Sequence, residues 1–168
     1  MIRIARIRDV KLPCRKTPGA AGVDFYLPKI DERFIADFRS KPQNKHIDFL
    51  AASSRIIIPC RSQALIPSGI MYEIPEGYAL IAHNKSGVST KKTVTALADV
   101  GDEDYQGELH LSVWNLSDDY ISFEEGDPVV QFLLVPIEKA PVIECAPDEL
   151  FTRGDTLRGA GGFGSTGA

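Results

Sequence analysis

The chain has 168 residues, of which 43% are hydrophobic and 25% are charged, as in a globular domain long enough to bury a core. Its net charge of −4 argues against a protein that mainly grips duplex nucleic acid, which needs a dense basic face, but it permits a small anionic substrate. No apolar run approaches the roughly 20 residues of a membrane helix, so we expect neither membrane nor nucleic acid as a partner.

The N-terminus and the cysteines indicate a cytoplasmic protein. The opening sequence MIRIARIRDV alternates apolar and basic residues and lacks the continuous apolar centre of a signal peptide. Cys14, Cys60 and Cys145 are odd in number, far apart and without a C-x-x-C pair, which supports neither a zinc site nor a disulfide framework. We interpret them as buried or idle free thiols in a reducing compartment.

Short β segments separated by turn residues dominate the sequence. Runs of β-branched, aromatic or alternating residues end at turn residues such as Pro59 and Gly77. The expected strands are Arg3–Ile7, Arg55–Ile58, Gln63–Pro67, Ile70–Ile74, Tyr78–Ala82, Glu108–Trp114, Tyr120–Phe123 and Val129–Ile137.

Two of these segments carry a clear burial pattern. In Glu108–Trp114, alternation places Leu109, Leu111 and Val113 on one face. The nearly continuous apolar run Val129–Ile137 predicts a strand buried on both faces. So many short strands at regular spacing predict an all-β sandwich or barrel.

One stretch differs from this β pattern. In Asp31–Lys41, Phe34 and Phe38 follow a helical spacing, with acidic residues first and basic residues last. This order suits the helix dipole and predicts a short amphipathic helix. The polar segment Pro42–His46 that follows is expected to form a loop.

Two polar segments contain residues suited to chemistry. Val100–Glu108 (VGDEDYQGE) crowds three carboxylates at a turn, as a general base or metal site requires, although a solvated acidic turn is the commoner meaning of such a motif alone. His83–Lys92 (HNKSGVSTKK) carries lysines, hydroxyls and a glycine at the end of a strand. It could expose the N–H groups of a helix N-terminus to an anion, and a solvated basic loop is the alternative.

The C-terminal sequence RGAGGFGSTGA, which starts at Arg158, has too few side chains to pack a core. A flexible tail is the simplest interpretation. The same residues could also close over a nucleotide, because glycine N–H groups, an arginine and hydroxyls all bind phosphate. Composition alone leaves both interpretations open.

Together and in order, five segments resemble the motifs of the homotrimeric dUTPase (deoxyuridine 5'-triphosphate nucleotidohydrolase) family. Those motifs run approximately A-G-x-D-L, P-R-S-G-L, G-x-I-D-x-D-Y-x-G-E, G-D-R-I-A-Q and R-G-x-G-G-F-G-S-T-G. The tail motif matches at every fixed position, and a viral or phage-type member is one interpretation. In this chain the motifs are Ala21–Phe25, Asn84–Val88, Asp99–Glu108, Gly126–Gln131 and Arg158–Gly167.

The resemblance implies a β jelly roll or barrel over residues 1–157, with a short helical insertion at about residues 29–54. It implies that a flexible glycine-rich tail, residues 158–168, closes the active site. It also implies a homotrimer whose active sites are shared between chains. The insertion has no role in the family scheme; a passive arm is the simplest reading. A trimer contact, or docking of an unidentified protein with Phe34 and Phe38 as anchors, are the alternatives.

The implied activity is hydrolysis of dUTP to dUMP and pyrophosphate, which lowers dUTP and supplies dUMP for thymidylate synthesis. Asp102 matches the aspartate that would activate a water for in-line attack on the α-phosphorus. Tyr105 matches the residue that packs under deoxyribose and excludes a 2′-hydroxyl. The backbone of Leu97–Asp102 would read the uracil edge. The cofactor would be Mg²⁺, held by the triphosphate and waters without a direct protein ligand.

The remaining motifs imply the contacts of the triphosphate and base. Asp24 would support the phosphate site, and Gln131 would lie near the α-phosphate. In the tail, Arg158 would hold the γ-phosphate and Phe163 would stack on uracil. The other implied substrate-binding residues, directed at phosphate, are Lys85, Ser86, Gly87, Gly164, Ser165 and Thr166.

The sequence departs from the family pattern near these residues. Lys85 replaces an arginine and keeps the charge without the planar fork. Asn84 replaces proline, and Ala96 replaces an asparagine that helps to fix uracil in many members. Gly101 replaces an aliphatic residue just before Asp102, so we expect a more mobile hairpin.

Two other functions remain open at this stage. The first is a dCTP deaminase, or a bifunctional relative, on the same fold; Asp102 and the intact tail weigh against it, and ammonia release from dCTP would identify it. The second is a regulatory binding protein that acts through the insertion. Deleting Asp31–Ser54 and measuring both turnover and partner binding would discriminate this second function from hydrolysis.

Overall fold

The computed structural model describes residues 1–50, 54–152, 154 and 156–161. The chain divides into two units, Met1–Glu138 and Lys139–Ala168. The first unit contains every described helix and strand, whereas the described residues of the second form turns and extended chain. The expected functional boundary at residue 158 therefore lies inside the second unit.

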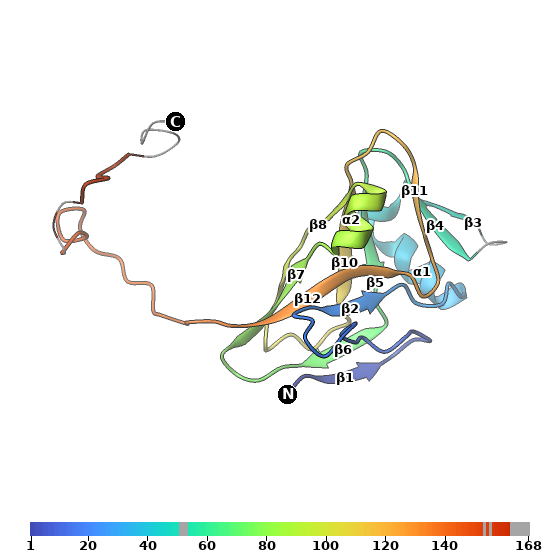
Figure 1. The fold of residues 1–168 in the computed structure, drawn as a ribbon, viewed down its shortest axis with the longest axis horizontal. Helices are drawn as coiled ribbons and strands as arrows, with labels where there is room; N and C mark the ends of the chain where they lie inside the picture. Colours follow the sequence, from blue (N-terminus) through green and yellow to red (C-terminus); the bar gives the residue numbers. More distant parts are fainter. Residues whose placement is uncertain (51–53, 153, 155, 162–168) are drawn as a thin grey trace. The chain divides into compact units, whose positions relative to one another are not determined.

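The first unit consists of short strands with two α-helices and one 3-10 turn (Figure 1). Within the described residues, no helix has the length and apolar character that crossing a membrane requires. The elements are β1 Arg3–Arg6, β2 Val23–Tyr26, α1 Glu32–Ser40, η1 Pro42–Asn44, β3 Asp48–Leu50, β4 Arg55–Ile58, β5 Gln63–Pro67, β6 Ile70–Glu73, β7 Tyr78–His83, α2 Ser86–Lys92, β8 Val94–Ala96, β9 Val100–Gly101, β10 His110–Asn115, β11 Ile121–Glu124 and β12 Pro128–Pro136.

All paired strands run antiparallel. The largest sheet has the order β2-β12-β7-β9, and two three-stranded sheets have the orders β5-β10-β8 and β11-β4-β3. The strands β1 and β6 form a fourth, two-stranded sheet. Neighbouring strands in a sheet are often distant in sequence, so the chain crosses repeatedly between sheets, as in the expected β jelly roll.

The burial predicted for the two patterned strands is confirmed only in part. Leu109, Leu111 and Val113 are buried as expected. In β12, Val130 and Phe132 are buried, but residues 133–135 are only half-buried. The prediction of burial on both faces is therefore wrong for the second half of β12.

The insertion is part of the core, which corrects the expectation of a passive arm or of exposed aromatic anchors. Phe34 and Phe38 of α1 are both 0% exposed, and their rings stack with centroids 5.7 Å apart. Asp31 caps the helix, because its Oδ1 accepts the N–H of Phe34 at 2.8 Å. The helix packs against β5, so its apolar face is already covered by this chain.

The segment after α1 is also ordered by the core. Residues expected to form a loop contain the 3-10 turn η1, and the short strand β3 follows it. The amide of Asn44 is buried and donates to the carbonyls of Phe38 and Leu65, both at 2.8 Å. Its Oδ1 accepts the N–H of Leu65 at 2.8 Å. These bonds tie the insertion to the edge of β5, because a buried amide must find partners.

The three cysteines are free, as expected. Cys14, Cys60 and Cys145 are all exposed, so the alternative of buried thiols is wrong. The Sγ of Cys14 lies 3.3 Å from the hydroxyl of Tyr26. Burial and then this contact raise the pKa of Tyr26 above its ordinary value.

Candidate active site

Three neighbouring strands bring Asp24, Gln131 and His83 into one row. In the antiparallel ladders, Gln131 of β12 lies opposite Asp24 of β2 on one side and opposite His83 of β7 on the other. The turn after His83 then brings Lys85 to the same edge of the sheet, where α2 begins (Figure 1). The fold thus gathers three predicted site residues from three separate motifs.

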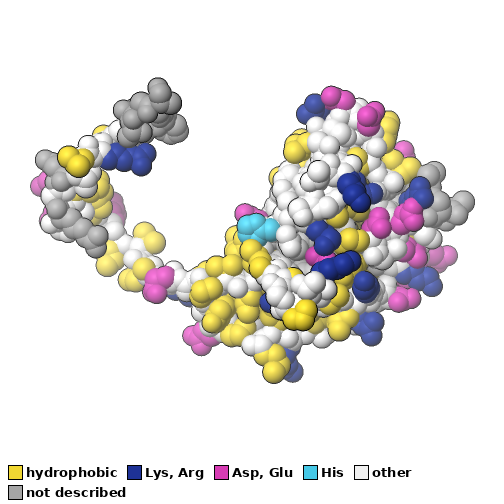
Figure 2. All heavy atoms as spheres, in the orientation of Figure 1, with side chains coloured by type: hydrophobic (Ala, Val, Ile, Leu, Met, Phe, Trp, Pro, Cys, Tyr) yellow, Lys and Arg dark blue, Asp and Glu magenta, His cyan; other side chains and the backbone are white. Residues whose placement is uncertain are grey.

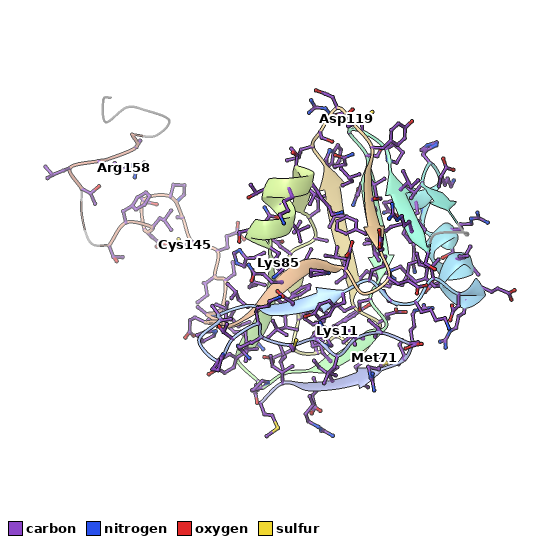
Figure 3. The ribbon with its side chains drawn as sticks, turned by 45° about the vertical axis from the view of Figure 1, so that its right-hand side comes forward. Lys11, Met71, Lys85, Asp119, Cys145 and Arg158 are labelled. Carbon is purple, nitrogen blue, oxygen red and sulfur yellow. The ribbon has the colours of Figure 1, made fainter. Side chains whose placement is uncertain are left out.

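Lys85 and Asp24 form an ion pair at this edge. The Nζ of Lys85 lies 2.7 Å from Oδ2 of Asp24, and Asp24 is only 4% exposed. A carboxylate buried to this extent needs a partner, and the lysine supplies one. The Lys85 side chain lies next to β12 (Figure 3), and it makes no capping bond to α2 because an ammonium group has no acceptor.

The first turn of α2 is open to solvent. The N–H groups of Val88 and Ser89 bond to the carbonyl of Lys85, as a helix requires, while those of Ser86 and Gly87 precede the first helical bond. A Cβ built on Gly87 would meet no atom within 4 Å. Lys and Arg side chains gather on the face that carries α2 and β12 (Figure 2). Free N–H groups beside positive charge are suited to phosphate oxygens.

Asn84 joins this loop to its neighbours, a role that the sequence did not reveal. Its Oδ1 accepts the N–H of Ala96 at 2.6 Å, and its Nδ2 donates to Oγ1 of Thr95 at 3.1 Å. Its carbonyl accepts from Nε2 of Gln131 at 2.9 Å. The amide that replaces the family's proline therefore links the ends of β7 and β8 to β12. The only signal in the sequence was the departure itself.

Gly22 is a second positioning residue that the sequence did not single out, although it lies in the first motif. A Cβ at this position would overlap Oε1 of Gln131 and lie 2.8 Å from its Cδ. The missing side chain therefore makes the space in which the Gln131 amide turns toward Asn84.

The acidic hairpin, Asp99–Glu108, holds two further predicted site residues, Asp102 and Tyr105. Asp102 and Tyr105 are exposed, and the Tyr105 hydroxyl donates to the carbonyl of Glu108 at 2.9 Å. The hydroxyl of Tyr72, on β6, donates to the carbonyl of Asp102 at 2.9 Å. Burial, and then the charge of Asp102, raise the pKa of Tyr72 from its ordinary value of 10 to about 12.

Asp102 and the lysine loop, residues 84–88, are separated along β7 within one chain. Gly101 pairs with Leu80, whereas the lysine loop follows His83, three positions further along the strand and about 10 Å away at the usual rise. Beyond Gly101 the chain continues away from His83, and beyond His83 it continues away from Leu80. Asp102 and Lys85 therefore lie further apart than Leu80 and His83 do. The structure therefore does not bring Asp102 together with the lysine loop in one chain.

The predicted tail residues fall in the second unit. The Nε of Arg158 donates to the carbonyl of Gly161 at 2.9 Å, within a local turn (Figure 3). The other predicted tail residues lie outside the described residues; they are Phe163, Gly164, Ser165 and Thr166.

Comparisons with known proteins agree with the motifs. The dUTPase family profile matches residues 39–167. The deoxyuridine 5'-triphosphate nucleotidohydrolases of Brucella melitensis and Rhizobium rhizogenes are 32% and 33% identical over 169 residues, which is 99% of this chain and 91% and 92% of theirs.

Solved structures show the same fold. A mutant dUTPase of Staphylococcus bacteriophage 80alpha, solved with dUpNHpp, superposes with a TM-score of 0.74 at 19% identity, covering 100% of this chain and 99% of that chain. A mutant dUTPase of phage phi11 of S. aureus, described with a structural Mg(II) ion, gives a TM-score of 0.66 at 17% identity, covering 86% and 96%. Because the family profile matches most of the chain and the relatives are similar to it over its full length, the chain belongs to the dUTPase family.

Proposed function

We propose that this protein hydrolyses dUTP to dUMP and pyrophosphate in the cytoplasm, lowering dUTP and supplying dUMP for thymidylate synthesis. The observation that carries the proposal is the convergence of Asp24, Lys85 and Gln131 at one edge of the largest sheet. These residues come from three motifs, and the edge combines positive charge with open backbone N–H groups. The relatives that share the chain's full length carry the name of this activity.

Asp102 is the proposed general base. Its carboxylate would orient a water molecule and take its proton while the water oxygen attacks the α-phosphorus in line. The bond from that phosphorus to the bridging oxygen breaks on the opposite side, and pyrophosphate leaves. The exposure of Asp102 at the tip of the hairpin leaves it accessible to a nucleotide.

The hairpin is also the proposed site of selection for deoxyribose and uracil. Tyr105 would pack under the sugar and leave no room for a 2′-hydroxyl. The backbone of Leu97–Asp102 would pair with the uracil edge, so cytosine would leave buried polar groups without partners at a cost of about 1–3 kcal/mol each.

The lysine loop and the tail would hold the triphosphate. Ser86 and Gly87 would bind phosphate oxygens through a hydroxyl and N–H groups, with Lys85 adding charge and Gln131 lying near the α-phosphate. From the tail, Arg158 would hold the γ-phosphate and Phe163 would stack on the base. The remaining proposed tail contacts to phosphate are Gly164, Ser165 and Thr166.

The donors at this site fit Mg²⁺ that arrives with its substrate. Among the described residues, no three His, Cys, Asp or Glu side chains come together as a protein-only metal site needs. Asp24 pairs with Lys85, and its carboxylate would also accept a hydrogen bond from a metal-bound water. Bound to the triphosphate with water completing its shell, the ion would neutralise charge on the leaving pyrophosphate.

A homotrimer with shared active sites is part of the proposal. Two features support it: the separation of Asp102 from the lysine loop along β7, and the half-buried second half of β12. A site that needs both groups would take them from different chains, and partly exposed apolar residues of this kind are typical of an interface.

Pyrophosphate release with dUTP, dCTP, dTTP and UTP, with and without Mg²⁺, tests the proposal. We expect rapid turnover of dUTP alone. Asp102→Asn should abolish turnover while dUTP still binds, whereas Asp104→Asn, a matched change on the same hairpin, should retain most activity. Normal hydrolysis by Asp102→Asn would overturn the assignment of the base, and ammonia release from dCTP would indicate a deaminase instead.

A further inference from the structure

Tyr72 and Gly101 make a specific contact beneath the acidic hairpin. Tyr72 projects from β6 and is 7% exposed, and its hydroxyl donates to the carbonyl of Asp102 at 2.9 Å. Its ring lies 6.3 Å from the ring of Tyr105, centroid to centroid. One buried side chain thus contacts the residue proposed as the base and lies beside the residue proposed to exclude ribose.

Gly101 provides the space for this contact. A Cβ built on Gly101 would lie 2.7 Å from the Tyr72 hydroxyl and 3.3 Å from Cβ of Leu80. The hydroxyl at position 72 and a side chain at position 101 therefore exclude each other in this arrangement. The family's aliphatic residue at this position is absent, and the tyrosine from β6 fills the volume instead.

The contact acts where the sheet stops holding the hairpin. The ladder of β9 with β7 ends at Gly101, so Asp102 is the first residue outside the sheet. The next bond to its carbonyl comes from the N–H of Tyr105 at 3.4 Å, which is long for a hydrogen bond. The Tyr72 hydroxyl is therefore the stronger restraint on the backbone of residue 102.

We propose that Tyr72 is a positioning residue, whose hydroxyl fixes the backbone of Asp102 and so sets the direction of its carboxylate toward the attacked phosphorus. The inference rests on the proposed function, in which Asp102 activates water. A carboxylate that acts as a base must be held close to its productive geometry, and errors of a fraction of an ångström slow the reaction.

Tyr72→Phe removes only the hydroxyl and tests the inference directly. We expect kcat for dUTP to fall about three- to ten-fold, the loss of one neutral hydrogen bond, with KM within about two-fold of the wild type. Tyr78→Phe, the same change on β7, should leave both constants unchanged. A kcat of Tyr72→Phe equal to that of the wild type, or a rise in KM alone, would overturn the inference.

A double-mutant cycle with Gly101→Ala gives a second test. Gly101→Ala alone should reduce kcat more than Tyr72→Phe, because the new methyl group displaces the hydroxyl and the backbone with it. In Tyr72→Phe/Gly101→Ala the nearest atoms to the methyl group would lie 3.3 Å away, so part of the lost kcat should return. Effects that simply multiply would show that the two positions do not act through this contact.

Asp102→Asn, assayed beside these variants, separates the inference from the function on which it rests. If Asp102→Asn still turns over dUTP, both the proposed base and the role of Tyr72 are wrong. If Asp102→Asn is inactive while Tyr72→Phe behaves as wild type, the proposed function stands and only the positioning role fails.

Discussion

Arg8 and Glu108 form a bidentate ion pair with Nε–Oε1 and Nη2–Oε2 distances of 2.8 and 2.9 Å, and their side chains are only 6% and 11% exposed. Asp37 of α1 binds the same guanidinium, and Glu108 also accepts the N–H of Gly69 at 2.7 Å. The hydrogen bond to Glu108 keeps the pKa of Arg8 above its ordinary value, so the guanidinium stays charged. The network connects the insertion to the base of the acidic hairpin.

Arg8→Ala should be strongly destabilising. It would leave Glu108 without its cation, while Asp37 would keep only Lys41, whose Nζ lies 3.3 Å from its Oδ1. Removing one partner of a pair buried to this extent costs about 3–5 kcal/mol. Urea unfolding followed by circular dichroism measures the loss. Arg3→Ala is the control, because Arg3 and Glu73 pair with side chains 73% and 63% exposed and should change stability by less than about 1 kcal/mol. Equal losses in the two variants would contradict the assigned role of the buried network.

Phe38→Ala tests whether the insertion is part of the core. Because Phe38 is fully buried, we expect the free energy of unfolding to fall by about 3–5 kcal/mol. Ile35→Ala, on the same helix but only half-buried, should cost clearly less. If Phe38→Ala unfolded at the wild-type urea concentration, the insertion would be an independent arm after all.

Gly22→Ala should impair catalysis with little loss of stability. The added methyl group would displace the Gln131 amide from the carbonyl of Asn84, so we expect kcat/KM for dUTP to fall at least about ten-fold. Gly19→Ala is the matched control in the same segment, because a Cβ there meets nothing within 4 Å. Wild-type activity in Gly22→Ala would show that the orientation of Gln131 does not matter.

The phenol of Tyr72 should make folding sensitive to alkali. Its pKa of about 12 in the folded chain exceeds the ordinary value of 10, so the folded state retains the proton longer than the unfolded state. The resulting stabilisation is complete below pH 10 and is lost as the pH rises toward 12, a change of about 2–3 kcal/mol. Unfolding of the wild type and Tyr72→Phe from pH 9 to 12 measures it, and parallel curves for the two proteins would refute it.

Local sequence patterns predicted which segments form helices and strands better than they predicted where these elements pack. Alternation identified the apolar residues Leu111 and Val113 that β10 buries, and the helical spacing of Phe34 and Phe38 identified α1. That spacing gives the apolar face of a helix but does not say which surface covers it, so the packing of α1 against β5 could not be foreseen. The three-residue elements η1 and β3 are too short to show any periodicity.

The candidate site was predictable only where motifs carried it. The resemblance pointed to Asp24, Lys85 and Gln131, and the structure brings them together. Asn84 and Tyr72 act through contacts with segments distant in sequence, which no local pattern contains. The role of Asp102 is a prediction that Asp102→Asn tests, and the roles of the tail residues stay predictions.

The separation of Asp102 from the lysine loop along β7 predicts that turnover in the proposed homotrimer needs more than one chain. Preparations of Asp102→Asn and Lys85→Ala, each inactive alone, should regain activity when unfolded and refolded together, since a mixed assembly can unite an intact hairpin with an intact loop. By the same reasoning, specific activity should decline on dilution, because a dissociated subunit would lack the groups that the proposed trimer supplies from its neighbours.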